Sequence, residues 1–477
     1  MNYTVRKAPF IRNKQDTKSI MLKLMIGLLV VLAFGLYNAS RYGTQFLTNG
    51  LILLAVAIAV SVAIEVIFAL VFKKNIKKHL ASSFPLITPL ILALTVPVNT
   101  KPYVVAIATA VAVAAGKMLF GGFGKNILNP AALGRILVLL LFAGVYSFDG
   151  IAQPTITTRL SILNWVTDSS TLLRVLNAYG GLDSVLVGTY FGAMGETCTV
   201  IILAVGAVLA IMNVIDWVIP ATYLGTMFVG ASIVALVKGI SFAYPLAVVA
   251  AGGVAFAGVF MLTDPVTAPT SRTGKIMYAA AASIITQFCR FFTGYPEGAV
   301  ISIIIVNVLA LLIDRLFINK QLKVEKRNII LVILSLVLAI GFTAFAGISK
   351  ENGAIIDRNN KEEGSPSAAV EMFPFSGEYP ENKAQVTVDG NIYHVSAVGY
   401  HGTNEFDIEI EGGKVKSVKV VAFNDTQGVG DMCINDEGYL NDFVGKDINS
   451  EIDAYSGATM TSKSLIAAVA AALQAAK

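Results

Sequence analysis

The sequence predicts a polytopic α-helical membrane protein with a small α+β domain at its C-terminal end. Hydrophobic residues make up 55% of the 477 residues and charged residues only 14%, which is far more apolar than an average soluble protein. Long apolar runs recur up to Ile348, and each can cross a hydrocarbon core of roughly 30 Å as a helix of about 20 residues. After Ser349 the sequence becomes polar.

About eleven transmembrane helices are expected by this criterion. The third contains Pro85, Pro89 and Pro97, so we expect a broken helix whose freed backbone groups need partners on neighbouring helices or in a cavity. The expected spans cover residues 20–38, 46–72, 84–98, 102–118, 130–146, 198–215, 217–237, 244–262, 276–292, 299–316 and 328–348.

Basic residues predict the orientation of these spans. Lys and Arg cluster at residues 6–18, 73–78 and 315–327, and short cytoplasmic loops hold the excess of positive charge. We therefore expect a cytoplasmic N-terminus, a first span that is retained rather than cleaved, and an extracytoplasmic C-terminal domain. These clusters and anionic lipid head groups account for the net charge of +5, so nucleic-acid binding is not indicated.

The C-terminal part has the pattern of an α+β domain. Alternating stretches at 385–398, 405–411 and 414–423 are separated by Asp389-Gly390 and Gly412-Gly413, which are hairpin turn signals. The Ala- and Leu-rich end, Lys463 to Lys477, is expected to be a helix. The predicted organisation is a membrane domain at 1–320, a transmembrane anchor at 321–350, a polar linker at 351–382 and the extracytoplasmic domain at 383–477.

The membrane part contains a weak internal repeat. Thr95-Val-Pro97 precedes a span that ends near Lys117, and Thr263-Asp-Pro265 precedes another that ends near Arg290. Spans one to five and six to ten could thus be inverted five-helix halves with a site at their interface. Chance recurrence of Pro-flanked breaks explains the same pattern.

The stretch from Asp453 to Thr461 carries the sharpest chemical signal. Its small residues permit close approach of a bulky group, and the Thr461 hydroxyl lies where a phosphate ester would face free N–H groups and the positive end of a helix dipole. On physical grounds alone, a Ser/Thr-rich helix N-cap that needs no ligand is the favoured explanation, because such caps are common.

This stretch resembles the flavinylation motif of the FMN-binding domain shared by the G subunit of the Rnf complex and the C subunit of the sodium-pumping NADH:quinone reductase. The resemblance implies that a flavin transferase attaches FMN to Thr461 through a phosphoester bond. Residues 399–446 follow the same domain, with Asp-Thr-Gln-Gly-Val-Gly at 425–430 in place of Glu-Thr-Pro-Gly-Leu-Gly. The flavin surroundings that it implies are Tyr455, Ser456, Gly457, Ala458 and Thr459.

The membrane part resembles the Rnf D subunit and its reductase counterpart B through residues 120–135, 195–197, 263–269 and 294–298. The chain therefore looks like a D–G fusion. The usual Ser-Gly-Ala-Thr-Pro-Leu of the Rnf D subunit is absent, but residues 168–173 keep its Ser/Thr/Leu pattern. Thr171 is thus the candidate for a second covalent FMN. Thr155 is a competitor, and loss of the site is a third reading; noncovalent riboflavin is also implied.

Ionisable residues inside a membrane are functional hypotheses because an unpaired charge there costs several kcal/mol. Glu65 is the most deeply placed and could pair with a basic residue or bind Na⁺ or H⁺. Lys117, Arg135 and Arg290 lie near expected helix ends, where we expect them to snorkel or cap. The breaks at Asn129-Pro130 and Asp264-Pro265 are expected to line a flavin or ion path.

The resemblance implies a protein that is active only within a multisubunit complex of a bacterial cell (inner) membrane. Electrons from partner proteins of the complex would pass through its FMN and drive Na⁺ or H⁺ transport, linking ferredoxin and NAD⁺ in the Rnf version or NADH and quinone in the reductase version. A non-pumping flavin conduit to extracellular acceptors is an alternative. A secondary transporter would explain inverted halves but not the Thr461 motif.

Overall fold

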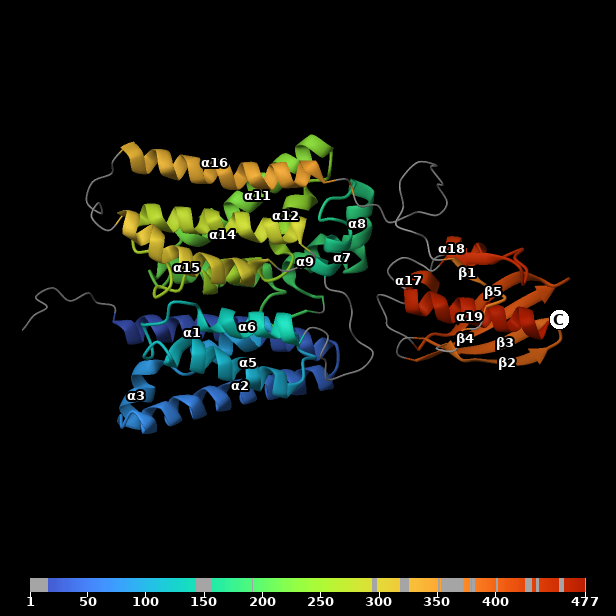
Figure 1. The fold of residues 1–477 in the computed structure, drawn as a ribbon, viewed down its shortest axis with the longest axis horizontal. Coiled ribbons are helices and arrows are strands. Elements are labelled where there is room, and N and C mark those ends of the chain that lie inside the picture. The colour runs from blue at the N-terminus through green and yellow to red at the C-terminus, as the bar shows by residue number, and fades with distance from the viewer. Residues whose placement is uncertain are drawn as a thin grey trace, which may run out of the picture. The chain divides into compact units, whose positions relative to one another are not determined.

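The computed structural model of the chain forms two compact units (Figure 1). The first is helical, and the second contains the described strands. The described residues are 16–142, 156–190, 192–293, 298–317, 326–350, 352, 372–377, 379, 382–399, 402–424, 431–434, 437–453 and 459–476.

The helical unit consists of long apolar helices, shorter helices and two π-helical turns. In order they are α1 Thr17–Arg41, α2 Thr44–Val71, α3 Ile76–Ser83, α4 Ile87–Thr95, α5 Pro102–Val113, η1 Ala114–Met118, α6 Pro130–Leu141, α7 Ile156–Ile162, α8 Ser169–Ala178, α9 Gly181–Val187, α10 Thr199–Ile211, α11 Val218–Lys238, α12 Ala243–Ala250, α13 Val254–Phe256, η2 Ala257–Met261, α14 Arg272–Phe292, α15 Ala299–Phe317 and α16 Lys326–Ser349.

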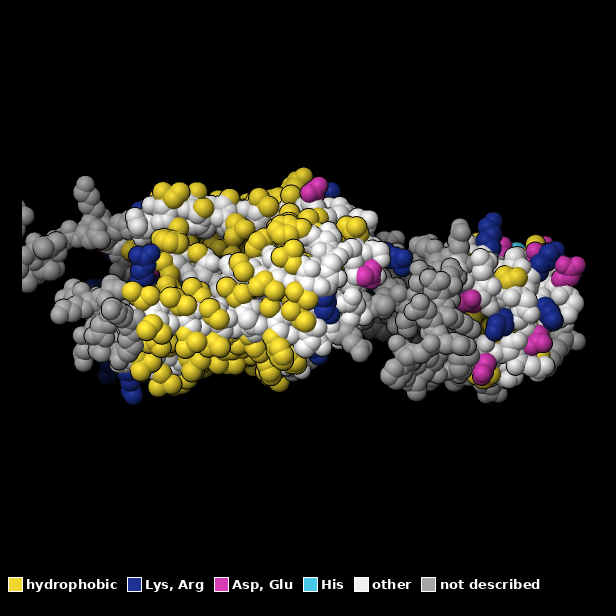
Figure 2. Space-filling view, turned by 90° about the horizontal axis from the view of Figure 1, so that it is seen from above, with side chains coloured by type: hydrophobic (Ala, Val, Ile, Leu, Met, Phe, Trp, Pro, Cys, Tyr) yellow, Lys and Arg dark blue, Asp and Glu magenta, His cyan; other side chains and the backbone are white. Residues whose placement is uncertain are grey.

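Helices occur at every span expected from the sequence. Among the described residues, five are long and apolar enough to cross a membrane, and one bent pair makes a sixth. Figure 2 shows hydrophobic side chains over most of the visible face of the helical unit, with Lys and Arg mainly toward its ends. This unit is therefore a multi-pass membrane domain; the number and direction of its crossings stay predictions.

Two of the expected spans contain or border a break. The third, 84–98, contains only α4, which begins after Pro85 and ends before Pro97; the break from α3 lies at its first residues, where Phe84 takes a left-handed φ of 50°. The eighth, 244–262, is bent by 66° between α12 and α13, at a position that no proline marks. Gly252, with φ 72°, permits this turn because glycine has no Cβ to clash there.

The second unit is built on a four-stranded antiparallel meander, β2-β3-β4-β5, with α19 packed against β2, β3 and β4. A short antiparallel pair, β1-β6, completes the strands (Figure 1). The elements are β1 Met372–Pro374, β2 Ala384–Asp389, β3 Ile392–Val398, β4 Thr403–Glu411, β5 Lys414–Ala422, α17 Asp431–Ile434, α18 Glu437–Asn441, β6 Glu451–Asp453 and α19 Thr459–Ala475.

The predicted turns are confirmed, because Gly390, Gly412 and Gly413 all have positive φ between paired strands. Inward residues alternate along β3 and β4 and form one core with α19. β1 lies inside the stretch that we expected to be linker and pairs with β6. The final helix begins at Thr459 rather than Lys463, since Ser and Thr are tolerated in a first turn, where N–H groups lack intrahelical acceptors.

Candidate functional site

Thr461 lies in the first turn of α19, not before the helix as its motif suggested, and it is only 3% exposed. The first four N–H groups of an α-helix have no intrahelical acceptor, and the helix dipole is positive there. This end of α19 therefore suits the phosphate of a nucleotide such as FMN. A phosphoester at Thr461 requires the hydroxyl to become accessible first.

The remaining motif residues are only partly described. Thr459 is the first residue of α19. The residues Tyr455, Ser456, Gly457 and Ala458 lie outside the described part of the chain. Their predicted role around the flavin stays a prediction.

Asn404 connects α19 to the sheet, and the sequence analysis did not single it out. This fully buried residue of β4 donates from Nδ2 to Ser464 Oγ at 3.4 Å, and Ser464 in turn donates to the carbonyl of Ala397 at 3.1 Å. Asn404 Oδ1 accepts from the N–H of Asn424 at 3.1 Å. One side chain thus fixes both α19, a turn after Thr461, and Asn424, the residue before the 425–430 signature.

Gly402 explains part of the 399–402 signature. A Cβ at this position would lie 2.0 Å from the carbonyl oxygen of Asn424. The N–H of Gly399 also donates to the carbonyl of Gly402 at 2.7 Å. Only glycine permits the close approach that brings the 424 segment beside β4.

Thr171, the candidate second tether, lies in the first turn of α8. The Asp168 carboxylate caps this helix, accepting from the N–H groups of Ser170 and Thr171 at 3.0 and 3.1 Å. Burial raises the pKa of Asp168, but hydrogen bonds from Ser170 and Thr171, side chains included, outweigh it and hold the pKa below its usual range. Thr171 is 7% exposed, so a phosphate there would have to displace a carboxylate contact. Its competitor Thr155 lies outside the described residues.

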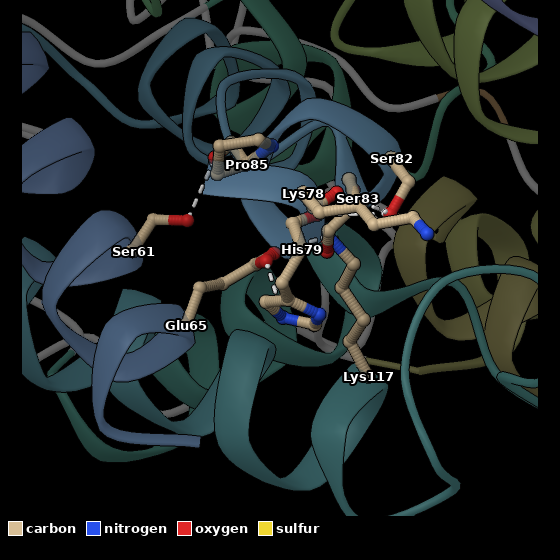
Figure 3. A network of polar contacts seen from close by, with 8 residues as sticks. All are labelled: Ser61, Glu65, Lys78, His79, Ser82, Ser83, Pro85 and Lys117. Carbon is tan, nitrogen blue, oxygen red and sulfur yellow. Dashed lines mark hydrogen bonds and ion pairs between the residues drawn. The ribbon is translucent and has the colours of Figure 1, made fainter. Parts of the chain in front are cut away.

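Glu65 forms a buried charge cluster with Lys117 (Figure 3). Lys117 Nζ donates to Glu65 Oε1 at 2.5 Å and to the carbonyl of Ser83 at 2.6 Å. His79 Nε2 lies 3.3 Å from Glu65 Oε2. Glu65 is fully buried and Lys117 is 3% exposed. The expectation that Glu65 pairs with a basic residue is confirmed.

The same region supplies hydrogen-bond donors to backbone carbonyls at the break between α3 and α4. Its carbonyls at Ser83 and Pro85 accept hydrogen bonds from Lys117 Nζ and from Ser61 Oγ, the latter at 2.7 Å. Partners from neighbouring helices were predicted for this break, and these bonds confirm them. Glu65 Oε2, His79 Nε2 and Ser83 Oγ make no hydrogen bond within the described part of the chain.

Arg290 plays the corresponding part at the second break. Its guanidinium donates to the carbonyls of Val248 and Ala251, both at 2.7 Å, and lies 4.2 Å from the ring centroid of Trp165. Of the two expectations for the basic residues, snorkelling is wrong, since Lys117, Arg290 and Arg135 are only 3%, 3% and 5% exposed. Capping holds for Lys117 and Arg290, which donate to carbonyls at the ends of α3 and α12. For these two, carbonyls freed by the breaks supply acceptors inside the protein.

The two breaks match in sequence register. Phe84 and Gly252, their left-handed residues, precede Thr95 and Thr263 by the same number of residues. In each case a cationic side chain from the end of the following helix donates to the freed carbonyls. α3 and α12 lie toward opposite ends of the helical unit in Figure 1. These correspondences favour a repeat over chance.

Asn129 and Asp264, from the two predicted path-lining breaks, line one cavity of about 80 Å³ together with Lys117. Asn129 Nδ2 donates to the carbonyl of Met261 at 3.1 Å, and the N–H of Asn129 donates to Asn307 Oδ1 at 2.8 Å. The side chain of Asn129 thus joins the start of α6 to the end of η2. The cavity has room for a few waters.

Fold and site together define a multi-pass membrane protein that carries a small α+β domain suited to a phosphate-bearing cofactor. Residues 4–323 match the NQR2, RnfD, RnfE family, and residues 399–474 match the FMN-binding domain. The chain belongs to the NQR2, RnfD, RnfE family and joins to it a C-terminal FMN-binding domain. The predicted fusion is confirmed.

Characterised relatives of the membrane part come from two kinds of complex. The D subunit of the proton-translocating ferredoxin:NAD(+) oxidoreductase complex of Clostridium ljungdahlii is 30% identical over 320 residues, 66% of this chain and 94% of the relative. The D subunit of the Na(+)-translocating ferredoxin:NAD(+) oxidoreductase complex of Acetobacterium woodii is 32% identical over 319 residues, which cover 66% of this chain and 93% of the relative. The B subunit of the Na(+)-translocating NADH-quinone reductase of Pseudomonas paraeruginosa is 32% identical over 246 residues, which cover 48% of this chain and 59% of the relative.

Proposed function

We propose that this chain is the flavin-carrying membrane component of an Rnf-type ion-translocating ferredoxin:NAD⁺ oxidoreductase complex. The observation that carries the proposal is the presence, on one chain, of a near full-length match to Rnf-type D subunits and an FMN-binding domain. Electrons from the other proteins of the complex pass through its FMN, and their flow drives Na⁺ or H⁺ transport. The 48% of this chain that matches the B subunit of the NADH-quinone reductase makes a quinone-linked complex the second candidate.

Thr461 is the attachment residue in this proposal, linked to FMN by a flavin transferase. When bound, FMN supplies one- and two-electron redox chemistry. The chain's part is to hold the phosphate at the N-terminus of α19 and to fix that helix on the sheet through Asn404 and Ser464. A covalent tether keeps the cofactor from being lost outside the cell, where we place this domain.

A second FMN at Thr171 is proposed with less support from the local geometry, because its hydroxyl takes part in the cap made by Asp168. Attachment there requires α8 to open at its first turn. A chain with one FMN favours the non-pumping conduit to extracellular acceptors. Riboflavin in the membrane unit stays a proposal on the family resemblance alone.

Glu65 is the proposed ion-path residue. Its Oε2 lies 3.3 Å from His79 Nε2 but makes no hydrogen bond among the described residues, and with Ser83 Oγ these atoms offer a polar spot inside the membrane unit. The Lys117 ammonium 2.5 Å from Oε1 already balances the Glu65 charge, so a proton fits this spot better than Na⁺, which needs several oxygen ligands and no adjacent cation. The matched breaks support inverted halves around this region.

The deciding experiment is ultraviolet flavin fluorescence of the denatured full chain in a gel after co-expression with a flavin transferase. Wild type should fluoresce, Thr461→Ala should lose signal, and Thr461→Ser, which keeps a hydroxyl, should retain it. Residual signal in Thr461→Ala that disappears with Thr171→Ala supports two tethers. A dark wild-type band rejects covalent FMN.

A further inference from the structure

An apolar groove of about 450 Å³ runs between α10, α11 and α12 of the helical unit. Its volume is within the range of small-molecule sites. Among the residues that line it, only Thr199 and Trp217 carry a polar side-chain atom, and the Thr199 hydroxyl already donates to the carbonyl of Ala250 at 3.3 Å. The interior of the groove therefore suits a hydrocarbon chain.

Small residues keep this groove open. Gly206 lies against Val259, where an added Cβ would be 2.8 Å from a methyl group. Gly225 also lines the groove, and a Cβ there would meet nothing within 4 Å. A larger side chain at Gly225 can thus enter the groove without a clash at its first carbon.

The length of the groove matches one leaflet of a bilayer. Along α11 its lining extends from Trp217 to Phe228, which is about 16 Å at a rise of about 1.5 Å per residue. The hydrocarbon core is roughly 30 Å thick, so the groove covers about half of it. A partner transmembrane helix, which crosses the full thickness, would fit this length poorly.

Positive charge lies at the Trp217 end. The Arg272 guanidinium is 5.8 Å from the ring centroid of Trp217, and Lys275 Nζ is 2.7 Å from Asp216 Oδ2. The single carboxylate Asp216 is paired with Lys275 and also attracts Arg272, so these two cations exceed it by one charge, and Arg272 makes no ion pair of its own among the described residues. A phosphate group at the bilayer surface would supply this ion-pair partner for Arg272.

We propose that this groove binds one acyl chain of an anionic phospholipid whose phosphate pairs with Arg272. Apolar lining, half-bilayer length and the unpaired cation at one end are the three properties that such a lipid matches. The site is separate from the flavin and from the Glu65 cluster, so it stands whether or not the proposed electron transfer does.

The test is native mass spectrometry of the purified full chain released from detergent, titrated with phosphatidylglycerol and, separately, with phosphatidylcholine. One phosphatidylglycerol should be retained preferentially. Arg272→Gln should weaken the binding of phosphatidylglycerol about fivefold, which is roughly the contribution of one cation near an anionic lipid surface. Gly225→Leu should fill the groove and remove the retained lipid.

Matched controls separate the groove from general effects. Gly341 of α16 also has open space at its Cβ but does not line the groove, and Lys18 is an exposed cation away from it. Gly341→Leu and Lys18→Gln should leave retention unchanged, and equal loss in them overturns the site. Unchanged retention in Gly225→Leu also overturns it, as does equal binding of phosphatidylcholine with no effect of Arg272→Gln. If Gly225→Leu removes a bound quinone or polypeptide instead of a lipid, the proposed occupant is rejected.

Discussion

Replacing Lys117 with methionine should destabilise the helical unit by about 3–5 kcal/mol, the usual cost of removing one partner from a buried ion pair. Glu65 is fully buried and its Oε1 lies 2.5 Å from Lys117 Nζ, so its carboxylate would lose this ammonium and keep, among the described residues, only the His79 imidazole, 3.3 Å from Oε2, as an ionisable neighbour. The carbonyl of Ser83 also loses its donor, which adds about 1–3 kcal/mol for an unsatisfied buried acceptor.

The double variant Glu65→Gln/Lys117→Met separates these two contributions. It contains neither charge, so only the unsatisfied Ser83 carbonyl should cost stability, about 1–3 kcal/mol. The double variant should therefore be more stable than Lys117→Met alone. Lys101→Met, at the exposed start of the same helix, should change stability by less than about 0.5 kcal/mol.

Tryptophan fluorescence during detergent-induced unfolding of the full chain measures this stability. Both tryptophans of the chain, Trp165 and Trp217, lie in the helical unit, so the signal excludes the C-terminal domain. If the double variant is no more stable than Lys117→Met alone, or if Lys117→Met behaves like Lys101→Met, the ion-pair reasoning is refuted.

Three further predictions concern other contacts. Arg290→Lys should destabilise the helical unit by about 1–3 kcal/mol in the same unfolding assay, because lysine lacks the fixed fork with which the guanidinium donates to two carbonyls. The same variant should shift the fluorescence emission of Trp165, and an unshifted spectrum would contradict the stacking of Arg290 on that ring. Gly402→Ala places a Cβ 2.0 Å from the Asn424 carbonyl oxygen, so limited proteolysis should cleave the C-terminal domain faster, and unchanged cleavage would show that the backbone can relax. The pKa of Asp168 is lowered on folding, so its stabilisation is fully present above the ordinary aspartate pKa and is lost progressively as pH falls toward the lower pKa of the folded state. Asp168→Asn should therefore lower the unfolding midpoint more at pH 7 than at pH 3, and an equal effect at both would refute the linkage.

The C-terminal domain was largely predictable because its signals are local. Alternating residues and glycine turns specify β2 to β5, since side chains on a strand alternate between faces. β1 was not predictable, because a three-residue strand has no period of its own and forms only by pairing with β6. The start of α19 at Thr459 was missed because cap and first-turn residues use the same side chains.

The membrane unit was predictable in class but not in its interior. Long apolar runs predicted the positions of the transmembrane helices. Residues 156–187 nevertheless fold into three short helices, which no long apolar run predicts. The break at the start of the third span was visible from its prolines. The break in the eighth depends on Gly252, whose left-handed conformation is one of several that glycine adopts, so the sequence permits it without requiring it.

The sequence by itself determined that this chain is a membrane protein joined to an FMN-binding domain, because hydropathy, turn residues and the motif ending in Thr461 are properties of contiguous residues. Only the tertiary structure decided how its buried charges are held. Lys117 and Arg290 were expected to snorkel or to cap, and each donates to carbonyls that a broken helix brings to it from a distant segment. Spatial proximity across the fold decides such pairing, because a charge far from water takes whatever acceptors the neighbouring backbone leaves unsatisfied.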